Sequence, residues 1–277
     1  MKNNKVSAEK QLLNMEMVGF LMDAGLGERI LSIIEASVKN AHDTSKMATI
    51  ETAKSWGVRE EFDTYFPIFV EINKRNIDMK DVMGSLNLNL TKALESSETF
   101  GDIVASLVKQ GANEKAITIM NSMLGYGNDE LNRILRGVEE YNEREAELKS
   151  IQSENASMRS ALSMYRDAYE IYKKILYEIY FKAKKTRKRD DNLFHKFFKE
   201  EFPALRKNFN NKLRNDEAHL VYDTRDSFSP EDIVKHSKLL LIRSMTAVVA
   251  KHEVITGLFT DSLAFIKNSW DKKLKRA

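Results

Sequence analysis

Apolar residues recur every three or four positions along most of this chain, which is the spacing that places them on one face of an α-helix. In the first half of the chain, glycines separate these stretches, and glycine commonly follows the end of a helix. A β-sandwich would need turn residues roughly every 8–12 positions, and the chain lacks them. The pattern therefore predicts an all-α fold. The short helices expected in the first half span 8–23, 28–41, 45–56, 62–75, 99–109 and 113–124.

A different pattern begins near residue 129, where apolar and aromatic residues follow a seven-residue repeat. Asn155 occupies a position at which a buried asparagine sets the register of parallel dimers. We expect a long connecting helix over 138–164 that pairs with a second copy as a coiled coil. The same repeat also fits a long helix whose seam packs against its own domain. The seam consists of Tyr141, Arg144, Leu148, Ile151, Asn155, Met158, Leu162, Tyr165, Tyr169, Tyr172, Leu176 and Ile179.

Helix start and stop signals divide the rest of the chain. After a basic run, Asp190 offers an N-cap for a helix that reaches about Lys207. A further helix is expected over about 211–223. The Ser229-Pro230 pair, followed by two acidic residues, begins the next helix, because serine caps and proline fits the first helical position. We expect that helix to stop at Gly257 and a last amphipathic helix to follow it.

Three regions follow from these signals: a helical N-terminal domain over 1–137, the long helix over 138–164, and a bundle of four to five helices over 165–277. Their charges differ. Residues 1–150 carry 18 Lys and Arg against 24 Asp and Glu, a net charge of −6, whereas residues 151–277 carry 26 against 17, a net charge of +9. We hypothesise that the acidic N-terminal domain restrains the basic bundle as a sensor or inhibitor, with a scaffold role as the alternative.

Composition excludes several classes of protein. The chain has no cysteine, so disulfides, thiolate metal sites and cysteine nucleophiles are ruled out. None of the five histidines shows the His-Glu-x-x-His spacing of a zinc site, and no glycine cluster follows a strand-like run. We therefore expect no metal and no cofactor. Neither a signal peptide nor a run of about 20 apolar residues is found, which favours a cytoplasmic protein without a membrane partner.

The basic second half favours a polyanionic partner, either nucleic acid or an anionic membrane surface. Solvated helix faces would give the same charge. No apolar face flanks the basic run over 182–189 in the way that helices lying on a membrane require, so nucleic acid is the better interpretation.

One stretch combines groups that can act together on a phosphodiester. Asn215 and His219 are four residues apart on the expected helix and share a face, and the long side chain of Arg214 can bend back toward them. Arginine binds non-bridging phosphate oxygens and stays charged while negative charge develops on them. Histidine can take the proton of a ribose 2′-hydroxyl and give one to the leaving 5′-oxygen. This set predicts RNA cleavage that needs no metal.

This motif, an Arg followed by a polar residue, three more residues and a His on the third helix of a helical bundle, resembles the HEPN superfamily of ribonucleases. The resemblance covers roughly residues 160–256, including the order of the helices. It implies metal-independent RNA cleavage by a homodimer whose two motifs face each other. It also implies roles in toxin–antitoxin or antiviral defence systems, with a regulatory protein partner. Tyr222 follows His219 by three residues, whereas some toxin branches have a tyrosine at two, so their modification chemistry is not carried over.

The candidate site residues form two groups. In the catalytic group, Arg214 stabilises the transition state, Asn215 orients the phosphate or the histidine, and His219 is the base and acid. A second match to the spacing, Arg189 and His195, is interpreted as a phosphate contact by Arg189 or a solvated side chain. A non-catalytic, all-helical dimeric adaptor or RNA-binding protein is the alternative function. The substrate-binding group is Lys182, Lys184, Lys185, Arg187, Lys188, Arg189, Lys207, Lys212 and Tyr222.

Overall fold

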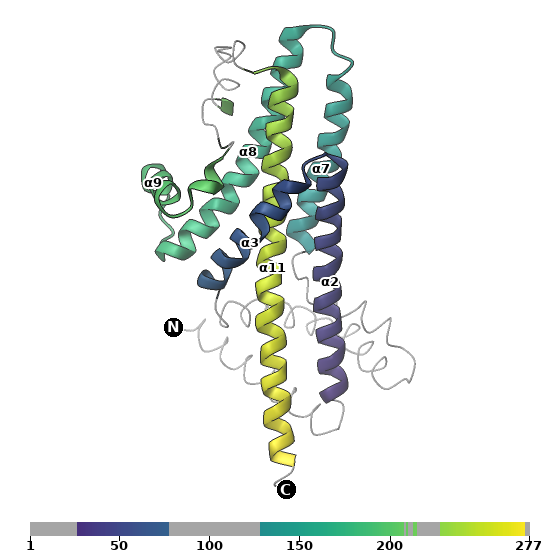
Figure 1. Cartoon of the computed structure of the whole chain (residues 1–277), viewed down its shortest axis with the longest axis vertical. Coiled ribbons are helices and arrows are strands. Elements are labelled where there is room, and N and C mark those ends of the chain that lie inside the picture. The colour runs from purple at the N-terminus through teal and green to yellow at the C-terminus, as the bar shows by residue number, and fades with distance from the viewer. Residues whose placement is uncertain (1–26, 78–127, 208, 210–212, 215–227, 275–277) are drawn as a thin grey trace, which may run out of the picture. The chain divides into compact units, whose positions relative to one another are not determined.

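The computed structural model describes residues 27–77, 128–207, 209, 213–214 and 228–274 of the 277-residue chain (Figure 1). Its regular structure is helical, and the described residues contain no strand, which confirms the all-α prediction. The elements are α2 (Gly27–Ser55), α3 (Arg59–Asn76), α7 (Asn128–Leu148), α8 (Glu154–Lys184), α9 (Asp191–Glu201), the 3₁₀-helix η1 (Pro203–Arg206) and α11 (Pro230–Leu274).

The chain divides into two compact units, and both α2 and α11 contribute residues to each. One unit comprises 1–44, 77–126 and 253–277, and the other comprises 45–76 and 127–252. We call the second one the bundle unit. It places α3 in the same unit as the C-terminal helices, which differs from the predicted division at residue 137. The reason lies in the core, where apolar side chains of α3 are buried together with those of α8.

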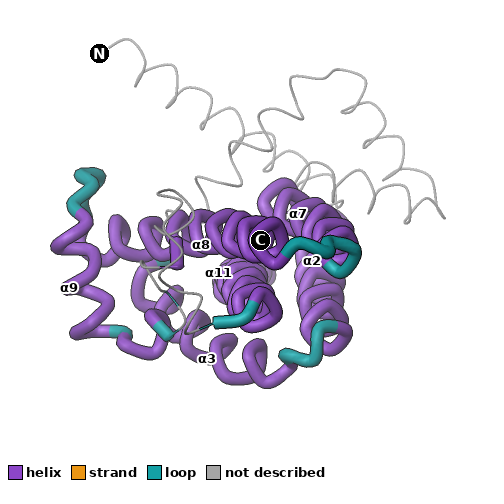
Figure 2. Tube along the Cα trace, turned by 90° about the horizontal axis from the view of Figure 1, so that it is seen from above, coloured by secondary structure: helices purple, strands orange, loops and turns teal. Residues whose placement is uncertain are grey.

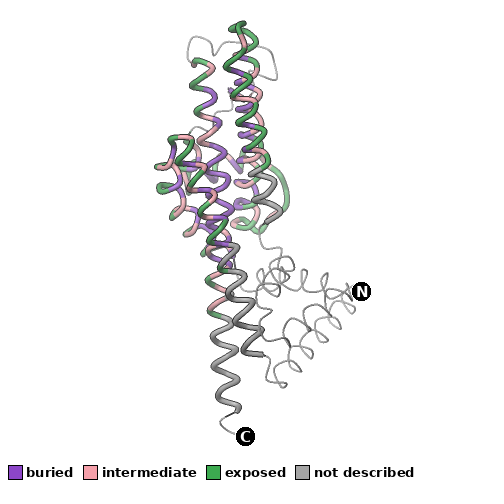
Figure 3. Tube along the Cα trace, turned by 90° about the vertical axis from the view of Figure 1, so that its right-hand side faces the viewer, coloured by how far each residue is buried: buried purple, intermediate pink, exposed green. Residues whose placement is uncertain are grey.

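Within the bundle unit, α3, α7 and α8 surround α11 (Figure 2). Residues 240–250 of α11 are all buried, as expected for a central helical stretch in which most positions are apolar. The buried hydroxyls of Ser237, Ser244 and Thr246 donate hydrogen bonds to the carbonyl oxygens four residues earlier, so their burial leaves no donor unused. Figure 3 shows the same arrangement as buried faces turned inward and exposed faces turned outward.

The predicted long helix over 138–164 is wrong. Helix α7 ends at Leu148 and α8 begins at Glu154, and residues 149–153 connect them. Two turn hydrogen bonds, from Ser150 N to Glu147 O and from Ile151 N to Leu148 O, end the first helix. Across this hairpin, Arg144 of α7 contacts two side chains of α8, Asp167 Oδ2 at 2.7 Å and Ser163 Oγ at 3.0 Å.

The seam residues consequently pack within their own chain, which is the alternative that the repeat allowed. Asn155 is exposed, so it is not the buried register-setting asparagine of a coiled coil. The heptad spacing arises because α7 and α8 each turn one apolar face to a shared core. Buried seam residues are Tyr141, Leu148, Met158, Leu162, Tyr165, Tyr169, Tyr172, Leu176 and Ile179.

Two predicted helix breaks are also wrong. Residues 28–41 and 45–56 form one helix, α2, because the intervening residues contain no glycine or proline to end it. Helix α11 continues through Gly257 to Leu274. A single glycine inside a helix costs only about 1 kcal/mol relative to alanine, which is too little to stop a long helix.

Other local predictions are confirmed. Residues 62–75 are helical, as part of α3, despite Pro67. Asp190 caps α9 by accepting a hydrogen bond from Leu193 N at 3.0 Å. Ser229 Oγ accepts from Asp232 N at 3.1 Å, and the Asp232 carboxylate accepts from Ser229 N in return. Helix α9 ends before the predicted limit of 207, because the residue preceding a proline disfavours helical backbone and Pro203 begins η1.

Candidate functional site

Arg214 is the described residue of the candidate catalytic motif, and both it and the preceding Leu213 are in helical conformation. Leu213 is fully buried, and Arg214 is partly exposed. Leu213 therefore packs in the core, and Arg214 presents its guanidinium toward the surface. The remaining motif and substrate residues, Asn215, His219, Lys212 and Tyr222, lie outside the described residues.

Arg214 is paired with an acidic residue of α8. Its Nε donates to Glu170 Oε1 at 3.0 Å, with 40% of the arginine side chain and 47% of the glutamate side chain exposed. A pair this exposed contributes roughly 0–1 kcal/mol to stability, so its main effect is to orient the guanidinium. Sequence analysis missed Glu170, and nothing in the sequence distinguishes it from the other acidic residues of α8.

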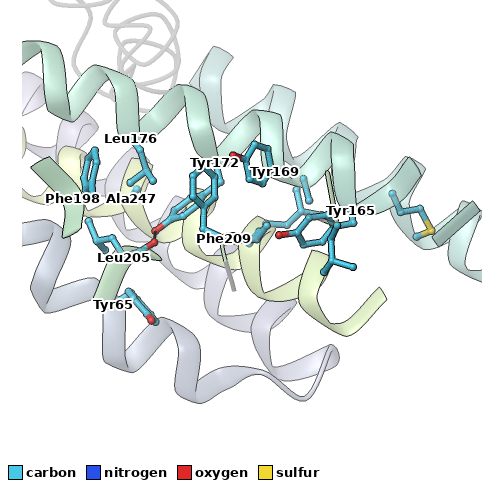
Figure 4. Packing of buried hydrophobic residues seen from close by; sticks show 14 of the residues in the cluster. Tyr65, Tyr165, Tyr169, Tyr172, Leu176, Phe198, Leu205, Phe209 and Ala247 are labelled. Carbon is cyan, nitrogen blue, oxygen red and sulfur yellow. Dashed lines mark hydrogen bonds between the residues drawn. The ribbon is translucent and has the colours of Figure 1, made fainter. Parts of the chain in front are cut away.

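The backbone that precedes Arg214 is held by side chains from other helices. The Tyr65 hydroxyl of α3 donates to Ala204 O at 3.0 Å, and the Tyr172 hydroxyl of α8 donates to Leu205 O at 2.9 Å. Figure 4 shows Tyr172 and Tyr65 reaching toward Leu205 from two different helices. Two consecutive carbonyls of η1 are thus bound by two different helices.

A third contact comes from Arg243 in the middle of α11. Its Nη1 donates to Lys207 O, and its guanidinium forms an ion pair with Glu61 of α3. The same guanidinium lies 4.1 Å from the centroid of the Tyr65 ring. Arg243 is fully buried. We refer to Tyr65, Tyr172 and Arg243, with the three carbonyls that they bind, as the carbonyl clamp.

Sequence reasoning did not identify Arg243 as important, although a signal was present. It is the one charged residue in the otherwise apolar or hydroxyl-bearing run 239–250. A charge at such a position is buried when the helix is central, and a buried charge needs a partner.

The clamp tyrosines remain hydrogen-bond donors at neutral pH. Burial raises the pKa of both Tyr65 and Tyr172, and the nearby Arg243 charge, which acts in the opposite direction, does not cancel that effect. Both hydroxyls are therefore protonated throughout the physiological range.

Phe209, which lies between η1 and Arg214 in the sequence, packs against aromatic rings of α8. The Phe209 ring stacks on Tyr169 with centroids 4.1 Å apart and planes 3° apart, and it meets Tyr172 edge-on at 5.9 Å. These rings are labelled together in Figure 4. Leu213 is also buried, so both of the described residues between Lys207 and Arg214, Phe209 and Leu213, lie in the core.

The predicted substrate-binding cations lie at the end of α8 and in the connector to α9. Lys182, Lys184, Lys185, Arg187, Lys188 and Arg189 are all exposed. Two of them cover aromatic rings, since Lys184 Nζ is 5.0 Å from the Phe197 centroid and the Arg189 guanidinium carbon is 5.2 Å from that of Tyr177. Lys185 caps α8 in the left-handed conformation, with φ 50°. Lys207 is exposed as well.

An aromatic cluster lies beneath these cations. Tyr177 stacks on Phe194 at 4.2 Å, Tyr180 meets Phe197 at 5.5 Å, and Phe198 packs against both phenylalanines of α9. We call Tyr177, Tyr180, Phe194, Phe197 and Phe198 the aromatic cluster.

His195 borders this cluster. It is partly buried on α9, where its ring lies 5.2 Å from that of Phe194 and 6.3 Å from that of Phe209. Burial, with the Arg206 charge as the second cause, lowers the pKa of His195. In the second Arg–His match, therefore, the histidine packs among aromatic rings and the arginine lies over the Tyr177 ring.

The candidate cations at the end of α8 are separated from the partner of Arg214 along that helix. Glu170, which holds Arg214, precedes Lys184 by 14 residues of continuous helix, which corresponds to about 20 Å at 1.5 Å per residue. Arg189 is closer, because its guanidinium lies over Tyr177, seven residues after Glu170.

No protein-family model, curated protein or solved structure matches this chain. Among the described residues, no helix is long and apolar enough to cross a membrane. In the same residues, no three histidine, aspartate or glutamate side chains gather where they could hold a metal ion.

Proposed function

We propose that this protein is a metal-independent RNA endonuclease of the HEPN type that acts as a dimer. The observation that carries the proposal is the placement of Arg214. Its guanidinium is oriented by Glu170 at the surface, while the backbone on its N-terminal side is bound to three helices. An arginine fixed in this way suits the stabilisation of charge that develops on a phosphate, because its position does not depend on the substrate.

The proposed reaction needs one base, one acid and one cation. His219 takes the proton of a ribose 2′-hydroxyl, and the resulting oxygen attacks the adjacent phosphorus. The bond to the 5′-oxygen breaks, and that oxygen receives a proton from an imidazolium, supplied by the same histidine or its counterpart in the dimer. Arg214 binds the non-bridging oxygens, and Asn215 orients the phosphate or the histidine. The products carry a 2′,3′-cyclic phosphate and a 5′-hydroxyl.

The exposed cations at the end of α8 supply the electrostatic part of RNA binding. Lys184, at the end of α8, is separated from Glu170 by about 20 Å of helix and would contact a nucleotide remote from the scissile bond, whereas Arg189 lies over Tyr177, only about 10 Å from Glu170 along the helix. Contacts of this kind to phosphates weaken as the salt concentration rises and carry little sequence preference.

The family resemblance extends the proposal to biology. It favours a cytoplasmic toxin or defence effector that is held in check by a regulatory protein, with the N-terminal region as a second candidate for that restraint. A homodimer is part of the proposal, although the coiled coil is not its means of assembly, because the seam residues are buried within the chain.

A non-catalytic adaptor is the second candidate, and one observation favours it. Glu170 offsets the charge of Arg214, and an offset guanidinium binds phosphate less strongly than an isolated one. In a dimeric adaptor, the same basic surface would bind RNA or a partner without cleaving it.

The test is cleavage of a labelled single-stranded RNA by the purified full-length protein in the presence of EDTA. We expect cleavage with cyclic phosphate ends, a loss of about 100- to 10,000-fold in His219→Ala, and a loss of about 100- to 1,000-fold in Arg214→Ala. Arg75→Ala is the matched control, because it removes another exposed arginine paired with a glutamate, Glu71, at 3.1 Å. Cleavage by His219→Ala at the wild-type rate overturns the proposal, and RNA binding without cleavage by the wild type favours the adaptor.

A further inference from the structure

Arg243 occupies a position where the core alone would favour an apolar side chain. It is fully buried, and its neighbours on α11 include Leu240, Leu241 and Ile242. Burying an ion pair costs so much hydration that apolar residues of similar size often give equal or greater stability. The pair of Arg243 with Glu61 is therefore poorly explained by stability alone.

Arg243 makes contacts that an apolar residue could not make. One guanidinium pairs with Glu61 of α3, donates to Lys207 O and lies against the Tyr65 ring. A planar fork with five donors can make these contacts at once, whereas a lysine ammonium cannot both stack and donate in two directions. Arg243 thus joins α11, α3 and the chain that follows η1.

The bound carbonyl is close to the candidate site in sequence. Lys207 precedes Arg214 by seven residues, and Phe209 and Leu213 between them are both buried. The carbonyl that Arg243 binds is therefore only a few residues from the arginine that Glu170 orients, and the two described side chains between them are anchored in the core.

We propose that Arg243 is a positioning residue that fixes the backbone at Lys207, seven residues before Arg214, so that Arg214 meets the scissile phosphate. This inference rests on the proposed ribonuclease function. Arg243 is remote from solvent and does not touch RNA. Its loss lowers the rate of the chemical step and leaves RNA affinity intact. A displacement of about 1 Å in a catalytic group can reduce a rate about 100-fold.

The experiment compares Arg243→Met, Arg243→Lys and the control Lys238→Gln with the wild-type protein. Lys238 is also on α11 and also partly buried in an ion pair, with Glu145 of α7 at 2.7 Å, but it has no contact with the clamp. Single-turnover cleavage of the labelled RNA gives the chemical rate. Binding of the same RNA is measured by anisotropy in a His219→Ala background, and thermal melting by circular dichroism shows that each variant is folded.

We expect Arg243→Met to cleave about 100-fold more slowly with RNA affinity within about twofold, Arg243→Lys to recover part of the rate, and Lys238→Gln to cleave normally. If Arg243→Met does not fold, the comparison of Arg243→Lys with Lys238→Gln decides the matter. Normal cleavage by the folded Arg243 variants, or equal losses in Lys238→Gln, overturns the positioning role while the ribonuclease proposal stands. Absence of cleavage by the wild type removes the ribonuclease proposal and this inference with it.

Discussion

Two stretches of α8 bury tyrosines in different ways. In the middle of the helix, the Tyr172 hydroxyl binds a backbone carbonyl of η1, alongside the matching contact from Tyr65 of α3. Near its end, Tyr177 and Tyr180 pack ring against ring with the phenylalanines of α9 and lie under exposed cations, and the Tyr177 hydroxyl donates to a side-chain oxygen, Asp191 Oδ1, rather than to a backbone carbonyl. In the middle of α8 the tyrosine hydroxyl therefore binds the backbone of another segment directly, whereas at the end of α8 the tyrosines contact the side chains of α9.

The difference separates two roles within one helix. The aromatic cluster supplies most of the apolar burial at its end of α8 and supports an exposed basic surface. The carbonyl clamp instead binds the backbone carbonyls of Ala204, Leu205 and Lys207, which precede Arg214 in the chain. Substitutions in the two regions should therefore differ in kind as well as in size.

The largest expected effect is in the aromatic cluster. Phe194 is almost fully buried between Tyr177 and Phe198, and Phe194→Ala should reduce the free energy of unfolding by about 3–5 kcal/mol, because it leaves a cavity among rings. Urea denaturation measures the change. Leu193→Ala is the matched control, since Leu193 is 55% exposed and its loss should cost less than about 0.5 kcal/mol. Equal losses in the two variants would mean that the cluster is not packed as described.

The next effect is in the clamp. Tyr172→Phe removes one hydroxyl and leaves Leu205 O without that donor in a buried site, so we expect a loss of about 1–2 kcal/mol. Tyr180→Phe makes the same chemical change where ring contacts dominate, and it should cost less than about 0.5 kcal/mol. Urea denaturation of both variants in parallel measures the two losses in the free energy of unfolding. A larger loss in Tyr180→Phe than in Tyr172→Phe would contradict the difference described between the two stretches.

A smaller difference should appear with pH. The lowered pKa of His195 means that the unfolded chain binds a proton more readily than the folded one. Its contribution to stability is therefore complete above the ordinary histidine pKa of about 6.5 and is lost as the pH falls through the folded value. We expect the melting temperature to fall between pH 7.5 and pH 5.5, and to fall less in His195→Gln. His236, whose pKa burial also lowers, remains in both proteins, so the difference between them isolates His195. If the melting temperature of His195→Gln depends on pH as that of the wild type does, the buried environment described for His195 is wrong.

The smallest effect on stability is expected for the exposed cations. Arg187→Gln and Lys188→Gln should each change the free energy of unfolding by less than about 0.5 kcal/mol. If RNA binds there, each should reduce the slope of log affinity against log salt concentration by about 0.7, the value for one phosphate contact on a single strand. Titrations at several salt concentrations give the slope. A slope equal to that of the wild type would remove these residues from the proposed RNA path.

Much of this fold follows from the sequence. The all-α class, the helical state around Pro67 and the caps at Asp190 and Ser229 are visible in residue patterns, because they depend on neighbours within a turn or two. The break between α7 and α8 is not visible in this way. A heptad repeat looks the same whether two copies of a helix pair or one chain folds back on itself, and only the tertiary packing distinguishes them.

The candidate site is less predictable for a similar reason. The motif around Arg214 and the basic run are local in sequence, and both were found. Glu170 and Arg243 lie 44 residues before and 29 residues after Arg214, and their roles come from the helix packing that brings them to one segment. The hydrophobic pattern places Tyr172 on the seam but not Tyr177, and it gives no sign that the hydroxyl of Tyr172 binds a backbone carbonyl while that of Tyr177 binds Asp191.

The contrast between the two stretches of α8 is tested most directly by hydrogen exchange, measured by mass spectrometry on peptides that cover 203–214 and 176–184. In Tyr172→Phe, we expect faster exchange at the amides of Lys207 and Phe209, which donate to Ala204 O and Arg206 O, with unchanged exchange at 176–184. In Phe194→Ala, we expect the reverse. Wild-type protection of 203–214 in Tyr172→Phe, or equal acceleration of both segments, would contradict the claim that the clamp fixes the chain leading to Arg214.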